Sequence, residues 1–432
     1  MAFPKYESYQ DTGEDWLGEI PKHWQLLRTK NIFRLICEPA PDNNNEELLS
    51  VYSDIGVKPR RELEERGNKA STTDGYWFVK KGDVIVNKLL AWMGAIGVSD
   101  YDGVTSPAYD ILRAYKPIDS KFYHYLFRNP ICISKLKQHS KGIMEMRLRL
   151  YFDEFGNIKI PYPPLEDQKR IVEFLDRKTA EIDQAIAQKQ RLIELLQEQK
   201  AIVINQAVTK GLNPDVSMHD SGFKSINKIP THWKSKRLKF AVNRIYDCKN
   251  RTPEYVENGE YFVIRTSNVR NGKLNLEDGL YTDRKNFIEW TQKGQPFLGE
   301  LVFTREAPAG EVAILPENVQ MCLGQRMMGI KPNEKEVLGN YLLYFLQSQS
   351  LKEYVALSSA GSTVSHLRVG QVFDIPIAYP ASIREQNDIA KFCAEYVKEI
   401  EKACSFIQND IAKIYEFRQI TIANAVTGKI KV

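Results

Sequence analysis

The sequence predicts an α/β (α+β) fold, with two tandem mixed α/β domains joined by two long antiparallel coiled-coil helices. Three observations carry this prediction. The chain repeats itself with a period above 200 residues, each repeat ends in a long segment of helix-forming residues, and short β-branched or aromatic runs mark the middle of each repeat. At about 150 residues per domain, 432 residues are also too many for one ordinary core. The period excludes a solenoid, whose repeats span about 20–50 residues.

The repeat is clearest at its start and at its end. Residues 20–24 (Ile-Pro-Lys-His-Trp) return 209 residues later as residues 229–233 (Ile-Pro-Thr-His-Trp). Residues 168–209 align with residues 386–427 at a constant offset of 218, and both segments close on Ala-Val-Thr. The segments between the shared start and the shared end differ between the two repeats in length and almost wholly in sequence. Simple duplication with drift is one interpretation, but the contrast between ends and middles favours a fixed frame that carries two different recognition surfaces.

The long segments are predicted to be helices that pair with each other. Residues 166–210 contain no glycine or proline, and apolar residues recur at alternating three- and four-residue steps in both repeats. A helix of about 40 residues is about 60 Å long, too long to bury its stripe on one compact domain. Two unrelated surface helices are the alternative, but the repeat favours antiparallel pairing about a pseudo-twofold axis. The predicted packing residues are Leu175, Ile182, Ile186, Ile193, Leu196, Ile400, Ile407, Ile411 and Ile414.

These segments divide the chain into four predicted parts. Residues 1–164 form the first domain, 165–211 the first long helix, 212–381 the second domain and 382–432 the second long helix. Runs such as Trp77–Val79 and Val84–Val86 predict strands in the first domain, and Tyr261–Ile264 and Leu301–Phe303 predict strands in the second.

Composition narrows the class of protein. With 60 Lys+Arg against 55 Asp+Glu, the net charge is +5. This charge is too small for a protein that binds nucleic acid over its whole surface as histones do, so any basic surface must be local. The longest uncharged apolar stretch, residues 89–98, has half the length of a membrane span, and no signal peptide is visible. Six scattered cysteines without a CxxC pair indicate reduced thiols. We therefore expect a cytoplasmic protein with no membrane partner.

Motifs for catalysis are missing from the sequence. It contains no P-loop, no dinucleotide-binding Gly-x-Gly-x-x-Gly, no His-Glu-x-x-His and no Gly-x-Ser-x-Gly. The cysteines and histidines do not cluster as zinc ligands would. We therefore expect no catalytic residue, no cofactor site and no metal site in this chain.

Several motifs combine into a family resemblance. They are residues 16–24 (Trp-Leu-Gly-Glu-Ile-Pro-Lys-His-Trp), 82–88 (Gly-Asp-Val-Ile-Val-Asn-Lys), 91–95 (Ala-Trp-Met-Gly-Ala), 106–109 (Ser-Pro-Ala-Tyr) and 163–171 (Pro-Pro-Leu-Glu-Asp-Gln-Lys-Arg-Ile), with the two Ala-Val-Thr helix ends. In their order and duplication, the chain resembles the specificity subunit of type I restriction-modification enzymes over essentially its whole length. The second repeat departs where Gly324–Met327 replaces Ser106–Tyr109. That change implies a different target-recognition subtype.

The resemblance implies a function without catalysis. Two target-recognition domains would each read one half of an asymmetric bipartite sequence in double-stranded DNA. The helices would set the spacer between the halves and dock two methyltransferase (modification) subunits, which a restriction/translocase subunit then joins. S-adenosylmethionine, ATP and Mg²⁺ would be bound by those partner subunits.

Basic and amide side chains are the candidates for DNA binding, because such groups pair with base edges and phosphates. For any one of them a structural role is an equal alternative. The predicted DNA-binding residues are Lys88, Arg147 and Arg149 in the first domain, and Arg265, Asn268, Arg305, Arg326 and Arg368 in the second. Trp24 and Trp233 are instead expected to be core anchors where each domain meets a helix.

Two other classes of protein stay open at this point. One is a protein-interaction scaffold built on the coiled coil, and the other is a self-contained DNA-modifying enzyme with a divergent site. Neighbouring genes for a methyltransferase and a helicase-nuclease would favour the specificity subunit over both.

Overall fold

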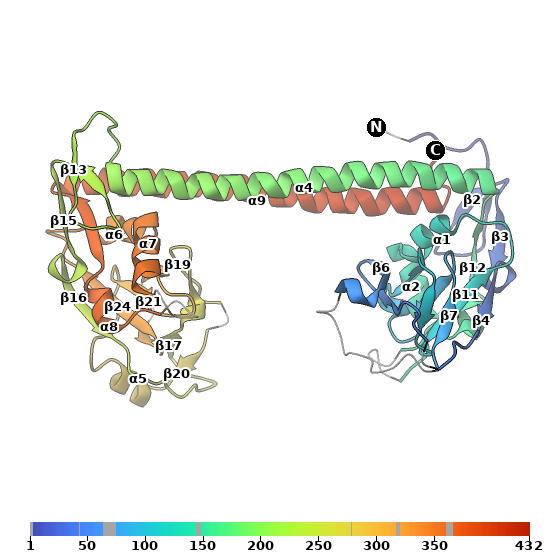
Figure 1. The fold of residues 1–432 in the computed structure, drawn as a ribbon, viewed down its shortest axis with the longest axis horizontal. Helices are drawn as coiled ribbons and strands as arrows, with labels where there is room; N and C mark the ends of the chain where they lie inside the picture. The colour runs from blue at the N-terminus through green and yellow to red at the C-terminus, as the bar shows by residue number, and fades with distance from the viewer. Residues whose placement is uncertain are drawn as a thin grey trace. The chain divides into compact units, whose positions relative to one another are not determined.

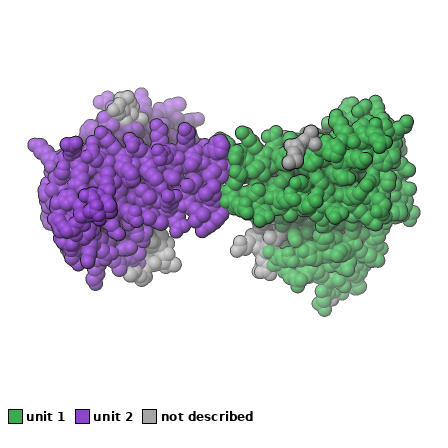
Figure 2. Space-filling view, turned by 90° about the horizontal axis from the view of Figure 1, so that it is seen from above, with its two compact units in different colours: residues 1–189, 408–432 green, residues 190–407 purple. Residues whose placement is uncertain are grey.

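The chain forms two compact units, Met1–Lys189 with Gln408–Val432 and Gln190–Ile407 (Figure 2). The computed structural model describes residues 3–42, 44–63, 75–143, 148–277, 279–316, 320–359 and 366–432. Each unit holds one mixed α/β domain and part of each long helix, α4 (Leu165–Lys210) and α9 (Ile383–Val426). The predicted fold class is confirmed.

A four-stranded antiparallel sheet forms the centre of the first domain, in the order β4-β11-β8-β9. Its strands are β4 (Phe33–Ile36), β11 (Tyr109–Ala114), β8 (Val84–Asn87) and β9 (Ile96–Val98). Successive side chains of a strand point to opposite faces, so Val84 and Val86 enter the main core whereas Ile85 enters a smaller cluster. Both faces of this sheet are therefore covered.

Shorter elements complete the first domain. Three further antiparallel pairs are β1 (Tyr9–Asp11) with β2 (Glu19–Pro21), β5 (Leu49–Tyr52) with β6 (Gly56–Pro59), and β7 (Trp77–Val79) with β10 (Gly103–Thr105). A fourth pair, β3 (Gln25–Arg28) with β12 (Lys159–Tyr162), joins the beginning and the end of the domain. The short helices are η1 (Thr29–Asn31), η2 (Arg60–Leu63), η3 (Ala91–Met93), α1 (Ser120–Phe127), α2 (Pro130–Gln138) and α3 (Phe152–Phe155).

The second domain repeats the central sheet. The order β16-β24-β21-β22 corresponds to β4-β11-β8-β9, and the same alternation places Leu301 and Phe303 in the main core and Val302 in a second cluster. The strands are β16 (Val242–Asp247), β24 (Met327–Pro332), β21 (Leu301–Thr304) and β22 (Val312–Ile314). Duplication of the sequence ends is therefore accompanied by duplication of the sheet between them.

The remaining elements of the second domain differ more from those of the first. A three-stranded sheet joins β20 (Tyr281–Thr282), β17 (Tyr261–Ile264) and β23 (Met321–Leu323), with β17 and β23 parallel. The other pairs are β13 (Met218–Asp220) with β14 (Lys228–Pro230), β15 (Trp233–Arg237) with β25 (Pro376–Pro380), and β18 (Val269–Arg270) with β19 (Lys273–Leu274). The short helices are η5 (Leu238–Phe240), η6 (Thr266–Asn268), α5 (Arg284–Trp290), α6 (Gly339–Phe345), α7 (Gln349–Ser358) and α8 (Val369–Phe373).

The two long helices lie side by side and antiparallel (Figure 1). In the first unit, Asp183 pairs with Arg418 at 3.1 Å between Oδ1 and Nε, and the Lys189 ammonium lies 3.0 Å from the Asp410 carboxylate. In the second unit the Gln197 amide donates to the Cys404 sulfur at 3.5 Å. From one pair to the next, the residue number rises along α4 from 183 to 197, while that of the partner falls along α9 from 418 to 404. Antiparallel pairing requires this order.

The predicted packing residues of the helices divide into two groups by burial. Leu175, Ile182, Ile186, Ile400 and Ile407 are buried. Ile193, Leu196, Ile411 and Ile414 are half-buried. Apolar packing therefore includes the middles of both helices, at Ile186 and Ile407, and is less complete at the positions that follow them.

None of the described helices has the length and apolar composition that crossing a membrane requires.

Candidate nucleic-acid interface

In each domain, two loops leave the same end of the four-stranded sheet, and they carry Lys88 in the first domain and Arg305 and Arg326 in the second. In the first domain, β8 ends at Asn87 opposite Tyr109, the first residue of β11. In the second, β21 ends at Thr304 opposite Met327, the first residue of β24. The loops that follow residues 87 and 304 and precede residues 109 and 327 are therefore equivalent in the two domains.

Lys88 and Arg305 occupy equivalent positions directly after these strands. The carbonyl of Lys88 accepts a hydrogen bond from the Leu150 amide, and that of Arg305 accepts one from the Leu367 amide, each at 2.9 Å. Lys88 lies 3.3 Å from the Asp110 carboxylate and also donates to the Pro107 carbonyl at 3.0 Å. Both basic side chains are mostly buried, with 21% and 10% of their surface exposed. They place positive charge at the sheet end and also hold the surrounding loops.

The acids beside these cations come from different strands. Asp110 lies on β11, whereas Asp247, 3.4 Å from the Arg305 guanidinium, ends β16. Burial raises the pKa of Asp110, although the neighbouring Lys88 ammonium acts to lower it. The same structural position is thus built from different residues in the two domains.

Three of the predicted residues are exposed. Arg326 has a left-handed backbone (φ 69°), and its Nε lies 3.0 Å from the Glu306 carboxylate, which also contacts His366 at 3.1 Å. Arg149 is exposed in the first domain, and its backbone pairs with that of Lys141. Arg368 is exposed at the start of α8. These three side chains are accessible to a nucleic acid.

Asn268 and Arg265 are less accessible to a nucleic acid than these three residues. Asn268 is buried: its side-chain carbonyl accepts from the Arg265 amide at 2.9 Å and its NH₂ donates to the Asn275 carbonyl at 3.2 Å. Both ends of the amide are engaged within the protein, which suits a structural role for Asn268 in its loop better than the predicted contact with DNA. Arg265 itself is half-buried. Arg147 lies outside the described residues.

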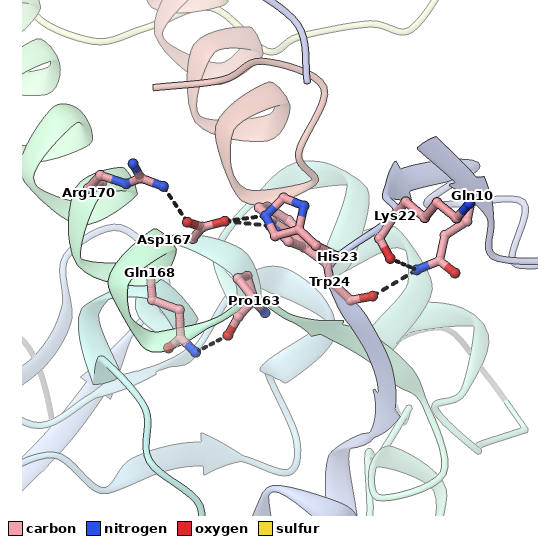
Figure 3. A network of polar contacts seen from close by, with 8 residues as sticks. All are labelled: Gln10, Lys22, His23, Trp24, Pro163, Asp167, Gln168 and Arg170. Carbon is pink, nitrogen blue, oxygen red and sulfur yellow. Dashed lines mark hydrogen bonds and ion pairs between the residues drawn. The ribbon is translucent and has the colours of Figure 1, made fainter. Parts of the chain in front are cut away.

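The motifs near the start of the chain form a clamp between the first domain and α4 (Figure 3). The Asp167 carboxylate, in the first turn of α4, accepts from the Trp24 indole at 3.0 Å and contacts the His23 ring at 2.7 Å. Arg170 also donates to Asp167. Gln168, the next residue, donates to the Pro163 carbonyl at 2.8 Å and accepts from the Asp119 amide at 2.9 Å. Trp24 is 1% exposed, so the predicted anchor at this junction is confirmed.

The second repeat builds the same clamp with glutamate in place of aspartate. Glu385 accepts from the Trp233 indole at 3.0 Å and contacts the His232 ring at 3.0 Å. Gln386 donates to the Pro380 carbonyl at 2.9 Å and accepts from the Leu338 amide at 2.8 Å. The duplicated His-Trp and acid-Gln pairs are therefore the parts that fasten each domain to its helix.

We expect Asp167→Ala to lower the free energy of unfolding by about 1–3 kcal/mol, because it leaves the buried Trp24 indole without its acceptor. Burial opposes ionisation of Asp167, but the hydrogen bonds from His23, Trp24 and Arg170 outweigh it and lower the pKa of the carboxyl. A lowered folded-state pKa means that this stabilisation is complete above the unfolded pKa of about 3.9 and is lost as the pH falls through the folded value.

Urea unfolding of the wild type and the variant at pH 7 and near pH 3 measures both effects. Glu166→Ala, at an exposed residue paired with Lys169 at 3.2 Å, is the control and should change stability little. Equal losses from the two variants would contradict the clamp.

Within the described ranges, no group of three or more His, Cys, Asp or Glu side chains is arranged to hold a metal ion. The exposed cations Arg149, Arg326 and Arg368 suit binding to an anionic polymer.

Comparisons with known proteins agree on one family. The family model described as the type I restriction modification DNA specificity domain matches residues 21–195 and 230–405. The MjaVIII type I restriction enzyme specificity subunit of Methanocaldococcus jannaschii is 24% identical over all of this chain and 98% of its own length. The EcoKI specificity subunit of Escherichia coli (strain K12) is 23% identical, covering 96% of this chain and 90% of its own.

Solved structures share the fold. The HsdS subunit from Thermoanaerobacter tengcongensis matches 95% of this chain and 98% of its own with a TM-score of 0.52 and 15% identity. A chain from work on the complex assembly and conformational transition of the type I R-M system matches 94% of this chain and 98% of its own, with a TM-score of 0.67 and 14% identity.

Proposed function

We propose a function from the premise that this chain belongs to the family of type I restriction modification DNA specificity domains. The chain is the DNA-recognition subunit of a type I restriction-modification system, and each of its domains reads one half of an asymmetric bipartite sequence. The observation that carries this proposal is the duplicated sheet, which has a basic residue at the same strand end in both domains but different loops around it. Equivalent frames with different loops suit two different half-sites.

The residues proposed to contact DNA are those at the sheet ends. Arg149, Arg326 and Arg368 are exposed and suit base edges or phosphates, whereas Lys88, Arg305 and Arg265 are more buried and suit the support of loops and the local positive charge. Arg147 stays in the proposal from its sequence position.

The partners follow from the type of system. Two methyltransferase subunits dock on α4 and α9 and on the domain flanks, a restriction/translocase subunit joins them, and the complex works in the cytoplasm. S-adenosylmethionine, ATP and Mg²⁺ belong to those partners. The paired helices set the number of base pairs between the two half-sites.

The two alternative functions are less well supported. Relatives matched along 90% or more of their length are named specificity subunits, a name that neither a general scaffold nor a self-contained enzyme would carry.

Methylome sequencing tests the proposal. Cells that express the chain with its methyltransferase partner should acquire methylation at one asymmetric sequence of two parts separated by a fixed spacer. Cells that express either protein alone should not. Methylation by the chain alone would favour the self-contained enzyme, and an unchanged methylome in the presence of both proteins would favour the scaffold.

A further inference from the structure

A short loop in the first domain exposes a cluster of large apolar side chains. Strand β8 is buried throughout, but the loop that follows it carries Leu89, Leu90 and Met93 with 44%, 43% and 53% of their surface exposed. This apolar tip (Leu89, Leu90 and Met93) starts one residue after Lys88, at the end of the sheet from which the DNA-reading loops leave. Exposed apolar clusters on a folded protein commonly mark a contact surface.

Hydrogen bonds fix the backbone of the loop that carries the apolar tip. The Asn87 amide donates to the Ala95 carbonyl at 3.0 Å, and the Ala95 amide donates to the Leu90 carbonyl at 3.1 Å, so the loop is closed at its base. Inside it, the Trp92 indole donates to the Leu89 carbonyl at 2.9 Å. Because the backbone is fixed in this way, binding through the tip costs little conformational entropy.

Arg128 fastens the tip to the rest of the domain. Its guanidinium donates to the carbonyls of Gly94 at 3.2 Å and Ile96 at 3.1 Å, directly after the tip. It also donates to the carbonyls of Ser53 at 3.0 Å and Asp54 at 2.9 Å in the β5–β6 turn. A loop braced from two sides presents its side chains in a defined direction.

Positive charge borders the apolar tip. The Lys137 ammonium lies 5.3 Å from the centre of the Trp92 ring. Arg149 is exposed, and the amide of the next residue, Leu150, binds the Lys88 carbonyl at the base of the loop. Asp110 offsets the charge of Lys88, whereas Arg149 lies at the exposed surface. An apolar centre with a basic border matches a DNA groove, whose bases lie between two phosphate backbones.

The second domain has a different tip at the equivalent position. Residues 305–310 read Arg-Glu-Ala-Pro-Ala-Gly and contain no large apolar side chain. Here Glu306 contacts both Arg326 and His366, which makes the surface charged. The two domains therefore present different chemistry from the same place on the same sheet.

We propose that Leu89, Leu90 and Met93 make apolar contact with the bases of the half-site read by the first domain, an inference that rests on the proposed function. Side chains of this kind either meet the methyl group of thymine in the major groove or insert between neighbouring bases. Both modes remove apolar surface from water, and neither one neutralises a phosphate. The first domain thus reads its half-site partly through shape and apolar contact, whereas the second reads through charged groups.

The test uses the full chain assembled with its methyltransferase subunits and a duplex with the sequence found by methylome sequencing. The triple variant Leu89→Ala, Leu90→Ala, Met93→Ala should weaken binding roughly 10- to 100-fold, while the slope of log affinity against log salt stays unchanged, because no ion contact is lost. Phe297→Ala with Leu298→Ala is the matched control. It removes two exposed apolar side chains at the opposite end of the equivalent strand of the second domain, and it should leave affinity unchanged.

Two further measurements separate the modes of contact. Replacing thymine by uracil in the first half-site weakens wild-type binding if the tip meets a methyl group, whereas an increase in 2-aminopurine fluorescence on binding indicates insertion. Either effect, reduced in the triple variant, supports the proposal. Met93→Ala alone provides the same readout if the triple variant unfolds at a lower temperature than the wild type.

Three outcomes would count against these ideas, and they are distinguishable. Unchanged affinity of the triple variant would overturn the proposal. Normal DNA binding with loss of the methyltransferase subunits from the complex would also overturn it, because the tip would then be a protein contact. Failure of the wild-type complex to bind its own methylated sequence would refute the proposed function itself.

Discussion

Exchange of residues 37–150 for the matching segment of another specificity subunit should change one half of the methylated sequence and leave the other half and the spacer unchanged. The exchanged segment includes β8, β11 and every predicted DNA-binding residue of the first domain. The exchange leaves in place the β3–β12 pair and the clamp of His23 and Trp24 on Asp167, which together join the domain to α4. Because these contacts are retained, the exchanged segment should take the same position relative to α4 as the segment that it replaces.

We expect a large change in the methylated sequence because each half-site is read by one domain. A mismatched base pair typically costs about 1–3 kcal/mol of binding free energy. Methylome sequencing of cells with the chimaera and the methyltransferase partner measures the result. Exchange of the equivalent segment 248–367 is the matched control and should change the other half alone. Simultaneous change of both halves by either chimaera would contradict a model with one reader per half-site.

The two long helices and the contacts that join each domain to them could be predicted from the sequence, because the two repeats share these parts. Trp24 and Trp233 lie at equivalent places in repeated motifs, and both indoles meet an acid in the first turn of a long helix. A heptad pattern without glycine or proline was likewise sufficient to predict α4 and α9. Local pattern and duplication point to the same architecture, so no long-range contact had to be known in advance.

The interface was less predictable, because the role of a polar residue depends on neighbours that are distant in sequence. Asn268 has a suitable type for reading adenine, yet its loop folds so that both ends of its amide bind backbone groups of the protein. Lys88 is similarly engaged by Asp110, which lies on a strand 22 residues further along the chain. The exposure of the apolar tip is not predictable from the sequence for a different reason. Residues 89–98 form an uncharged run, and the sequence alone does not separate its exposed leucines from the buried strand that follows.

A four-residue duplication in both long helices should lengthen the spacer of the recognised sequence. Repeating residues 187–190 in α4 and 408–411 in α9 copies Lys189 together with its partner Asp410, so the inserted turns retain an ion pair. Four helical residues add about 6 Å and, at 3.6 residues per turn, rotate the helix about 40° beyond one full turn. One base pair adds about 3.4 Å and about 35° of twist, so we expect a spacer longer by about one or two base pairs.

The two half-sites themselves should stay the same, because no residue of either domain changes, and methylome sequencing reads the half-sites and the spacer together. A four-residue insertion between Gly211 and Ser217, beyond the end of α4, is the control. It lengthens the chain by the same amount but not the helices, so the spacer should not change. Insertion into a heptad pattern locally unwinds a coiled coil, and some loss of stability is therefore expected in the double insertion. An unchanged spacer in a folded, active double insertion would show that the helices do not measure the target, and an altered spacer in the control would transfer that role to the connecting loop.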